Sequence, residues 1–211
     1  MQIFERVIDQ PIRSVLSILG QYIDAFYLGG DTGLALQIGH RKSEDLDFFS
    51  TSEFDENLLV NNIKGFQTIQ QYRGTVHGVL NGVRLSFLYY PVNLIKETYR
   101  WEGIKIASVA DLIAEKFKTV SQRGAKKDFG DLYAGYKSGI SIPQGCLYFK
   151  QRFKNTGIQF YSVLKGLTYF DDAESDPNPI WLQPDFSTDW EDIKTFFRDN
   201  IQLFEKELIN L

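Results

Sequence analysis

The sequence predicts an α+β protein in which an α/β lobe over residues 1–107 is followed by a helical lobe over residues 108–211. Short strand-like runs separated by turn residues dominate the first lobe, and apolar residues recur at helical spacing in the second. The 211 residues are 43% hydrophobic and 24% charged, which is typical of a folded globular protein. No stretch approaches the eighteen or so apolar residues of a membrane span, so we expect no membrane partner. The single cysteine fits a cytoplasmic protein.

Local signals place the elements of the first lobe. Pro11 suits the first turn of a helix, and Asn81-Gly82 is the dipeptide most favoured for a two-residue hairpin turn. The expected helices cover residues 11–25, 32–38 and 53–64, and the expected strands cover residues 26–28, 46–49, 66–71, 75–80, 83–89 and 104–107. These strands predict a mixed sheet.

The second lobe begins with a recognisable helix start. Ser108 and Asp111 resemble a capping box, and Gly124 is a natural stop for the same helix. Further helices are expected over residues 126–137, 144–155, 158–169 and 189–210, with a loop rich in Asp and Pro over residues 171–185.

The formal net charge of −4 conceals an uneven distribution of charge along the chain. Residues 116–165 carry a net charge of +8, and residues 166–211 carry −8. The basic segment suggests a polyanionic partner for one surface; alternatively, the acidic end folds back and neutralises it. The total charge therefore excludes only a protein that binds nucleic acid with its whole surface.

The segment of residues 28–49 carries the clearest chemical signal. An expected strand ends in Gly29-Gly30 immediately before a helix, which lets backbone N–H groups approach an anion. Ser43, Asp45 and Asp47 then alternate with Glu44, Leu46 and Phe48, so on a strand they share one face. Two carboxylates on one face repel each other unless a cation lies between them, and hard oxygen ligands suit Mg²⁺. A solvated strand face is the alternative, but the surrounding hydrophobic run favours a functional site.

Lys116 is the second unusual residue. Helical periodicity places it within the apolar stripe of the helix that begins at Ser108. An inward lysine needs a partner, and a phosphate, a carboxylate or snorkelling along its own stem would each satisfy it. Asp128 and Asp131 share one side of the next helix, where an ion-pair network with Arg123 is the structural alternative to a role in binding.

Two blocks of the sequence resemble a known family. GGDTGLALQIGHRKSEDLDFF (residues 29–49) and ASVADLIAEKFKTVSQRGAKKDFGDLYAGYK (residues 107–137) are similar to the two motif blocks of the AbiEii/AbiGii-type nucleotidyltransferase toxins. The resemblance covers about a quarter of the chain. It implies a DNA polymerase β-like nucleotidyltransferase fold with a helical second lobe, and a toxin paired with an antitoxin protein. It also implies nucleotide transfer from a nucleoside triphosphate, in some relatives to tRNA.

The resemblance also assigns roles by position. Asp45 and Asp47 would hold Mg²⁺, Lys116 would lie against the phosphates, and Asp131 would complete the catalytic set. The residues expected to bind substrate are Gly29, Gly30, Thr32, Arg41, Ser43, Arg123 and Asp128.

Two departures from the family pattern bear on these roles. Asp31 stands where the family usually has a glycine, and an acid there would repel a triphosphate unless a metal or Arg41 intervenes. The expected strand over residues 83–87 offers no third carboxylate. The sequence therefore predicts a nucleotidyltransferase acting on RNA or protein. A metal-dependent phosphohydrolase or nuclease, and a non-catalytic module that binds nucleotide or antitoxin, are the alternatives.

Overall fold

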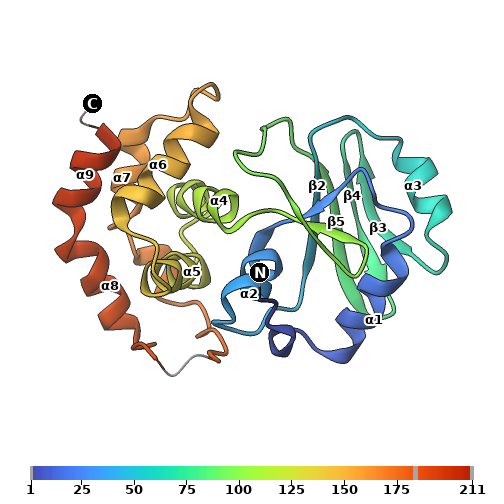
Figure 1. Ribbon diagram of the computed structural model, residues 1–211, viewed down its shortest axis with the longest axis horizontal. Coiled ribbons are helices and arrows are strands. Elements are labelled where there is room, and N and C mark those ends of the chain that lie inside the picture. The colour runs from blue at the N-terminus through green and yellow to red at the C-terminus, as the bar shows by residue number, and fades with distance from the viewer. Residues whose placement is uncertain (1, 183–184, 210–211) are drawn as a thin grey trace.

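The computed structural model describes residues 2–182 and 185–209. A mixed sheet with its helices lies beside a group of helices formed by the later part of the chain (Figure 1). The expected α+β class is confirmed. Within the described residues, no helix is both long and apolar enough to cross a membrane.

Among the described residues, the sheet has seven strands in the order β3-β4-β5-β2-β1-β7-β6. Two pairs, β2 with β5 and β1 with β7, are parallel, and the other neighbours are antiparallel. The strands are β1 (Tyr27–Leu28), β2 (Leu46–Ser50), β3 (Gln67–Tyr72), β4 (Thr75–Leu80), β5 (Val83–Tyr89), β6 (Tyr99–Trp101) and β7 (Ile104–Ile106). Asn81 and Gly82 both have positive φ, as the expected hairpin turn requires.

Helices pack on both faces of the sheet. The α-helices are α1 (Gln10–Leu19), α2 (Gly30–Ile38), α3 (Glu56–Asn62), α4 (Val109–Gln122), α5 (Lys126–Lys137), α6 (Ile142–Phe153), α7 (Phe160–Gly166), α8 (Trp190–Asp199) and α9 (Ile201–Ile209), with short 3-10 turns at Glu5–Val7 and Asp171–Ala173. α2 contacts β2 as well as α4 and α5, so it lies between the sheet and the later helices (Figure 1). Ser108 caps α4 by accepting a hydrogen bond from the N–H of Asp111, as expected.

Three expectations need correction. α1 ends at Leu19, and the chain turns at Gly20, where a Cβ would lie 3.2 Å from the carbonyl oxygen of Glu102. The helix expected over residues 189–210 is two helices divided at Asn200, and residue Asn210 lies outside the described residues. β6 was not expected, because its exposed residues show no alternation; it pairs with β7 through the Glu102-Gly103 turn, both residues of which have positive φ.

Two hydrophobic clusters stabilise the fold. One joins the sheet to α1 and α3, and the other joins α4–α9 to the opposite side of the sheet. Adjacent residues of β1 divide between them, since Leu28 belongs to the first and Tyr27 to the second. Every second side chain of β1 and β2 therefore points toward the later helices. This face of the two strands can carry a site between the sheet and those helices.

Candidate functional site

A cleft of about 570 Å³ lies between the sheet and the later helices. Its floor comes from β1, β2 and β5, and its opposite wall comes mainly from α4. The lining residues are Tyr27, Gly29, Gly30, Asp31, Asp45, Asp47, Phe49, Leu88, Tyr90, Ala107, Asp111, Leu112, Glu115, Lys116, Lys118, Thr119, Gln122, Arg123, Lys127 and Arg152. A volume of this size is ordinary for a small-molecule site.

The turn between β1 and α2 brings backbone close to the β2 carboxylates. The N–H of Gly29 donates to the carbonyl of Asp47 at 2.9 Å, and Gly30 adopts a φ of +56°. A Cβ at Gly30 would lie 2.9 Å from Oδ2 of Asp47, so only glycine fits there without displacement. No side chain caps the start of α2, so the N–H groups of its first turn are available for an anion.

Asp45 and Asp47 both line the cleft, as their alternation predicts. Asp45 precedes β2, and its Oδ1 accepts a hydrogen bond of 2.7 Å from Nε of Arg84, a largely exposed side chain. Asp47 lies opposite Ser86 on β5. Burial raises the pKa of Asp47, and the negative charges of Asp31 and Asp45 add to that rise. A cation placed between the two carboxylates would relieve this repulsion.

Lys116 is buried within the apolar stripe of α4, as the helical spacing predicts. Its partners in the structure are carboxylates. Nζ lies 2.8 Å from Oδ1 of Asp128 and 2.5 Å from Oδ2 of Asp131, and it also forms an ion pair with Asp31. Burial disfavours its charge, but these three acids raise the pKa of Lys116 above its ordinary value. Lys116 therefore remains an ammonium ion at the edge of the cleft.

Asp31, the residue that departs from the family pattern, is neutralised by three cations. Besides Lys116, its carboxylate contacts Nζ of Lys127 at 2.7 Å and Nη2 of Arg41 at 3.2 Å. Despite burial, these cations hold the pKa of Asp31 well below its ordinary value. The carboxylate of Asp31, which follows Gly30 in the turn between β1 and α2, is therefore ion-paired and fixed in place.

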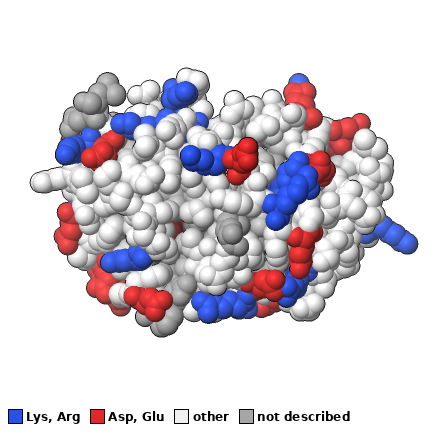
Figure 2. All heavy atoms as spheres, viewed as in Figure 1, with Lys and Arg blue, Asp and Glu red and all other residues white. Residues whose placement is uncertain are grey.

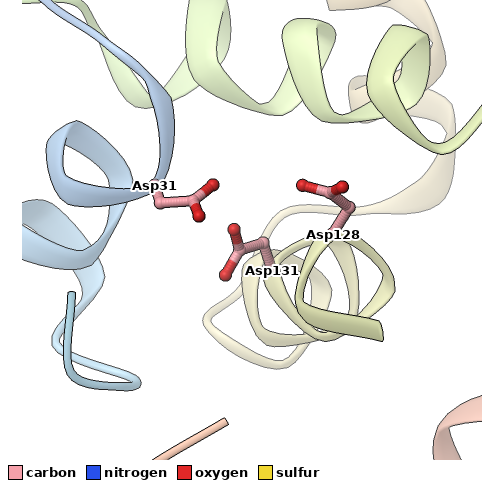
Figure 3. Close-up of side chains that lie close together, drawn as sticks. All are labelled: Asp31, Asp128 and Asp131. Atoms are coloured by element: carbon pink, nitrogen blue, oxygen red, sulfur yellow. The ribbon is translucent and has the colours of Figure 1, made fainter. Parts of the chain in front are cut away.

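Asp31, Asp128 and Asp131 point toward one another, the first from α2 and the other two from α5 (Figure 3). Their ligand atoms lie within 4.8 Å of one another, which is a spacing that a metal ion could use. Lysine and arginine side chains, however, already occupy the space around these oxygens. This group of acids therefore fits an ion-pair cluster and does not fit a metal site.

Asp131 connects the two halves of the molecule. It accepts hydrogen bonds from Nε and Nη2 of Arg41 at 2.6 and 2.8 Å, and its Oδ1 lies 2.7 Å from Nε2 of His40. Burial favours the neutral acid, but Arg41, Lys116 and His40 hold the pKa of Asp131 well below its ordinary value. Asp131 is fully buried and does not line the cleft.

The structure divides the expected site residues into two groups. Those that line the cleft are Gly29, Gly30, Asp45, Asp47, Lys116 and Arg123, and those that lie behind it are Thr32, Arg41, Ser43, Asp128 and Asp131. Ser43 precedes β2, and its hydroxyl is 2.7 Å from that of Thr32, which also hydrogen-bonds to the carbonyl of Asp45. Thr32 and Ser43 thus fix the segment before β2 against α2. Arg123 pairs with Asp128 at 2.9 Å.

A second polar network in the cleft was missed from the sequence. Arg152 of α6 lies 2.7 Å from Asp111 and 2.7 Å from Glu115, both on α4. The hydroxyl of Tyr90 donates to Glu115 at 3.1 Å. Acids at positions 111 and 115, one helical turn apart beside Lys116, were the available signal, but their partners come from distant segments.

The charged surface is mixed on the face seen in Figure 2, where cationic and anionic side chains are interspersed. Several cations of the basic segment point inward or pair with acids of the first lobe, among them Lys116 and Lys127 with Asp31. Others contact the acidic end, since Lys126 bonds to the carbonyl of Asp176 at 2.7 Å and Lys150 to that of Glu207 at 3.0 Å. Cations of the basic segment thus make ion pairs with the first lobe and backbone hydrogen bonds with the end of the chain.

Comparison with known proteins finds one relative by sequence and several neighbours by structure. No family model matches the sequence. The chain is 30% identical over 185 residues to the uncharacterized protein aq_aa25 of Aquifex aeolicus, covering 84% of this chain and 86% of that protein. In structure it resembles an H. pylori protein provisionally described as a nucleotidyltransferase, with 19% identity, a TM-score of 0.55 and coverage of 94% of this chain and 93% of the other.

A second structural neighbour is MenT4, a nucleotidyltransferase toxin of Mycobacterium tuberculosis H37Rv. The two chains share 17% identity with a TM-score of 0.51, over 90% of this chain and 83% of MenT4. These similarities confirm the expected nucleotidyltransferase fold.

Proposed function

Because the chain belongs to the family of the Aquifex aeolicus protein aq_aa25 and has the nucleotidyltransferase fold, we propose that it is a Mg²⁺-dependent nucleotidyltransferase. One observation carries the proposal. Asp45 and Asp47 line a cleft next to an uncapped helix start, with partly exposed Lys127 and exposed Arg123 beside them. Carboxylates for a cation and donors for phosphates are the groups that this transfer needs.

The carboxylates of Asp45 and Asp47 suit Mg²⁺ as ligands. Their oxygens are hard ligands, they face the same cleft, and the raised pKa of Asp47 reflects negative charge that a cation would offset. Arg84, which pairs with Asp45, is largely exposed and free to swing away. When bound, Mg²⁺ would neutralise the phosphate oxygens and orient the triphosphate.

Transfer joins an acceptor hydroxyl oxygen to the α-phosphorus and breaks the bond from that phosphorus to the bridging oxygen, so pyrophosphate leaves. The first-turn N–H groups of α2 and the ammonium of Lys127 would hold the phosphates. Lys116 neutralises Asp31 and so fixes the loop that presents these N–H groups. Asp131 is buried behind the cleft, so the acceptor proton would pass to Asp47 or to solvent.

The acceptor and the biological role are further parts of the proposal. The two motif blocks resemble AbiEii/AbiGii-type toxins, and MenT4 is described as a toxin. We therefore assign the chain an RNA acceptor, with tRNA as the first to test, and an antitoxin protein as a partner.

Incubation with α-labelled nucleoside triphosphates, Mg²⁺ and total RNA tests the activity. We expect label on RNA with the native protein and none with Asp45→Asn. Asp24→Asn is the matched control, because Asp24 is an exposed acid paired with Arg100 at 2.6 Å outside the cleft. It should transfer normally. Hydrolysed nucleotide without labelled acceptor would instead indicate a phosphohydrolase, and nucleotide binding without turnover would indicate a non-catalytic module.

A further inference from the structure

Three neighbouring strands of the sheet come from a stretch of chain that has no acidic residues. Residues 57–96, which include β3, β4 and β5, contain no aspartate or glutamate and four cations, Lys64, Arg73, Arg84 and Lys96. An even distribution of the 27 acids over the 211 residues would place about five acids there. This segment therefore has a formal charge of +4 in a chain whose total is −4, which favours a polyanionic partner.

One face of these three strands is open. Val76, Leu85 and Phe87 are buried in the cluster shared with α1 and α3, which lie on the side of the sheet away from the later helices (Figure 1). Residues that alternate with them point to the other face and are half-buried or exposed. This open sheet face consists of Gln67, Gln70, Tyr72, His77, Val79, Arg84, Ser86 and Leu88.

The register of the sheet makes the open sheet face continuous with the candidate site. Asp47 of β2 lies opposite Ser86 of β5. Beyond Ser86 come His77 of β4, whose Nδ1 lies 3.1 Å from Oγ of Ser86, and then Gln70 of β3. With strands about 4.8 Å apart, Gln70 lies roughly 14 Å from Asp47. A row of polar side chains thus leads from the carboxylates to the edge of the sheet.

The order of the strands sets the side from which an acceptor would approach. β1, which leads into the first turn of α2, and β5 flank β2 on opposite sides. In the proposed reaction the phosphates lie at that first turn, so pyrophosphate would leave on the side of β1. Because the attacking and leaving oxygens lie roughly in line through the phosphorus, the acceptor hydroxyl would approach on the side of β5. The open sheet face lies on that side.

The side chains of the open sheet face suit unpaired nucleotides. Tyr72 is 54% exposed, and its ring and that of half-buried His77 are flat surfaces on which bases stack. Gln70 is exposed and can hydrogen-bond to the edge of an unpaired base. Arg84 pairs with Asp45, but both side chains are exposed to solvent, so the pair contributes little and a phosphate can replace the carboxylate.

We propose that the open sheet face binds a single-stranded end of the RNA acceptor, with bases stacked on Tyr72 and His77. The inference rests on the proposed function, because it takes the end of this strand to reach Asp47 from the side opposite the phosphates. The positive charge of residues 57–96 and the continuity of the face with Asp47 favour RNA over a protein segment.

Fluorescence polarisation with labelled RNA tests the proposal without nucleotide and without turnover. The probe is a single strand of about twelve nucleotides, compared with its own duplex at one salt concentration, because affinity for RNA depends steeply on salt. We expect the single strand to bind about tenfold more tightly than the duplex, since only unpaired bases can stack on the face. Equal binding of strand and duplex would overturn the proposal.

Variants locate the binding surface. Tyr72→Ala should weaken binding of the single strand about tenfold, whereas Tyr72→Phe, which keeps the ring, should bind it as the native protein does. His77→Asn should also weaken binding. Tyr161→Ala is the matched control, because Tyr161 of α7 is 59% exposed and lies outside the open sheet face; it should change nothing.

Two measurements accompany these variants. Each should bind inorganic tripolyphosphate with the native affinity, which shows an intact phosphate site, and thermal melting checks that each is folded. If His77→Asn unfolds, exposed Tyr72 alone decides, and an unchanged single-strand affinity in Tyr72→Ala refutes the assignment. A native dimer that Tyr72→Ala converts to a monomer in light scattering would instead make this face a contact between two copies.

The outcomes separate this inference from the proposed function. Weaker RNA binding by Tyr72→Ala, with no transfer by the native protein to any acceptor, would support the RNA surface and refute the transferase. Transfer to RNA with the same KM for RNA in the native protein and Tyr72→Ala would do the reverse. Label on a protein acceptor, without binding of the single strand, would overturn the RNA surface alone. Absence of both binding and transfer would refute both.

Discussion

Asp131→Asn should destabilise the protein strongly, although Asp131 makes no contact with the cleft. The substitution removes the negative charge that faces Arg41 and Lys116, two cations with 4–5% of their side chains exposed. Breaking a buried ion pair by removing one partner costs roughly 3–5 kcal/mol, because the other charge is left buried. Here Lys116 keeps Asp31 and Asp128, and Arg41 keeps Asp31. We therefore expect the low end of that range, about 3 kcal/mol.

The consequence is measurable by thermal and urea unfolding. For a chain of this length, 3 kcal/mol corresponds to a fall in Tm of about 10 °C. The urea midpoint should fall with an unchanged m-value. Asp45→Asn is the control, because Asp45 is partly exposed and pairs with an exposed arginine, so its Tm should stay within about 2 °C of the native value. A Tm for Asp131→Asn as high as that of Asp45→Asn would refute the proposed connection between the two halves.

Three further predictions concern charge. Asp31→Asn should tighten tripolyphosphate binding severalfold by removing a negative charge from the phosphate loop; weaker binding in titration would contradict this. Burial lowers the pKa of His40 from 6.5, so the unfolded chain binds its proton more readily, and the free energy of unfolding should fall as pH drops from 7.5 to 5.5. His40→Gln should flatten that slope in urea melts at each pH. Because burial raises the pKa of Asp47, Mg²⁺ affinity should fall as pH is lowered from 7 to 5, and a pH-independent affinity would show that this carboxylate is not a ligand.

Local signals in the sequence predicted most of the fold. Ser108 caps its helix, the Asn81-Gly82 turn forms, and the alternation at Asp45 and Asp47 places both in the cleft. These features depend on neighbours along the chain. Exposed β6 carries no such pattern, so it was missed.

The partners of the site residues depend on contacts between distant segments. The spacing of α4 predicted that Lys116 is buried, but its partner Asp31 lies 85 residues away along the chain. The pairing of Arg152 with Asp111 spans 41 residues. A phosphate and a carboxylate satisfy an inward lysine equally well, so only the tertiary structure could decide between them.

The buried bonds from His40 and Arg41 to Asp131 limit how the molecule can move. Opening the cleft like a clamshell would separate these groups and the packed surfaces of α2, α4 and α5. A ligand thus meets a cleft whose walls are already set, and only exposed side chains at its rim, such as Arg84 and Lys127, need rearrange to admit it.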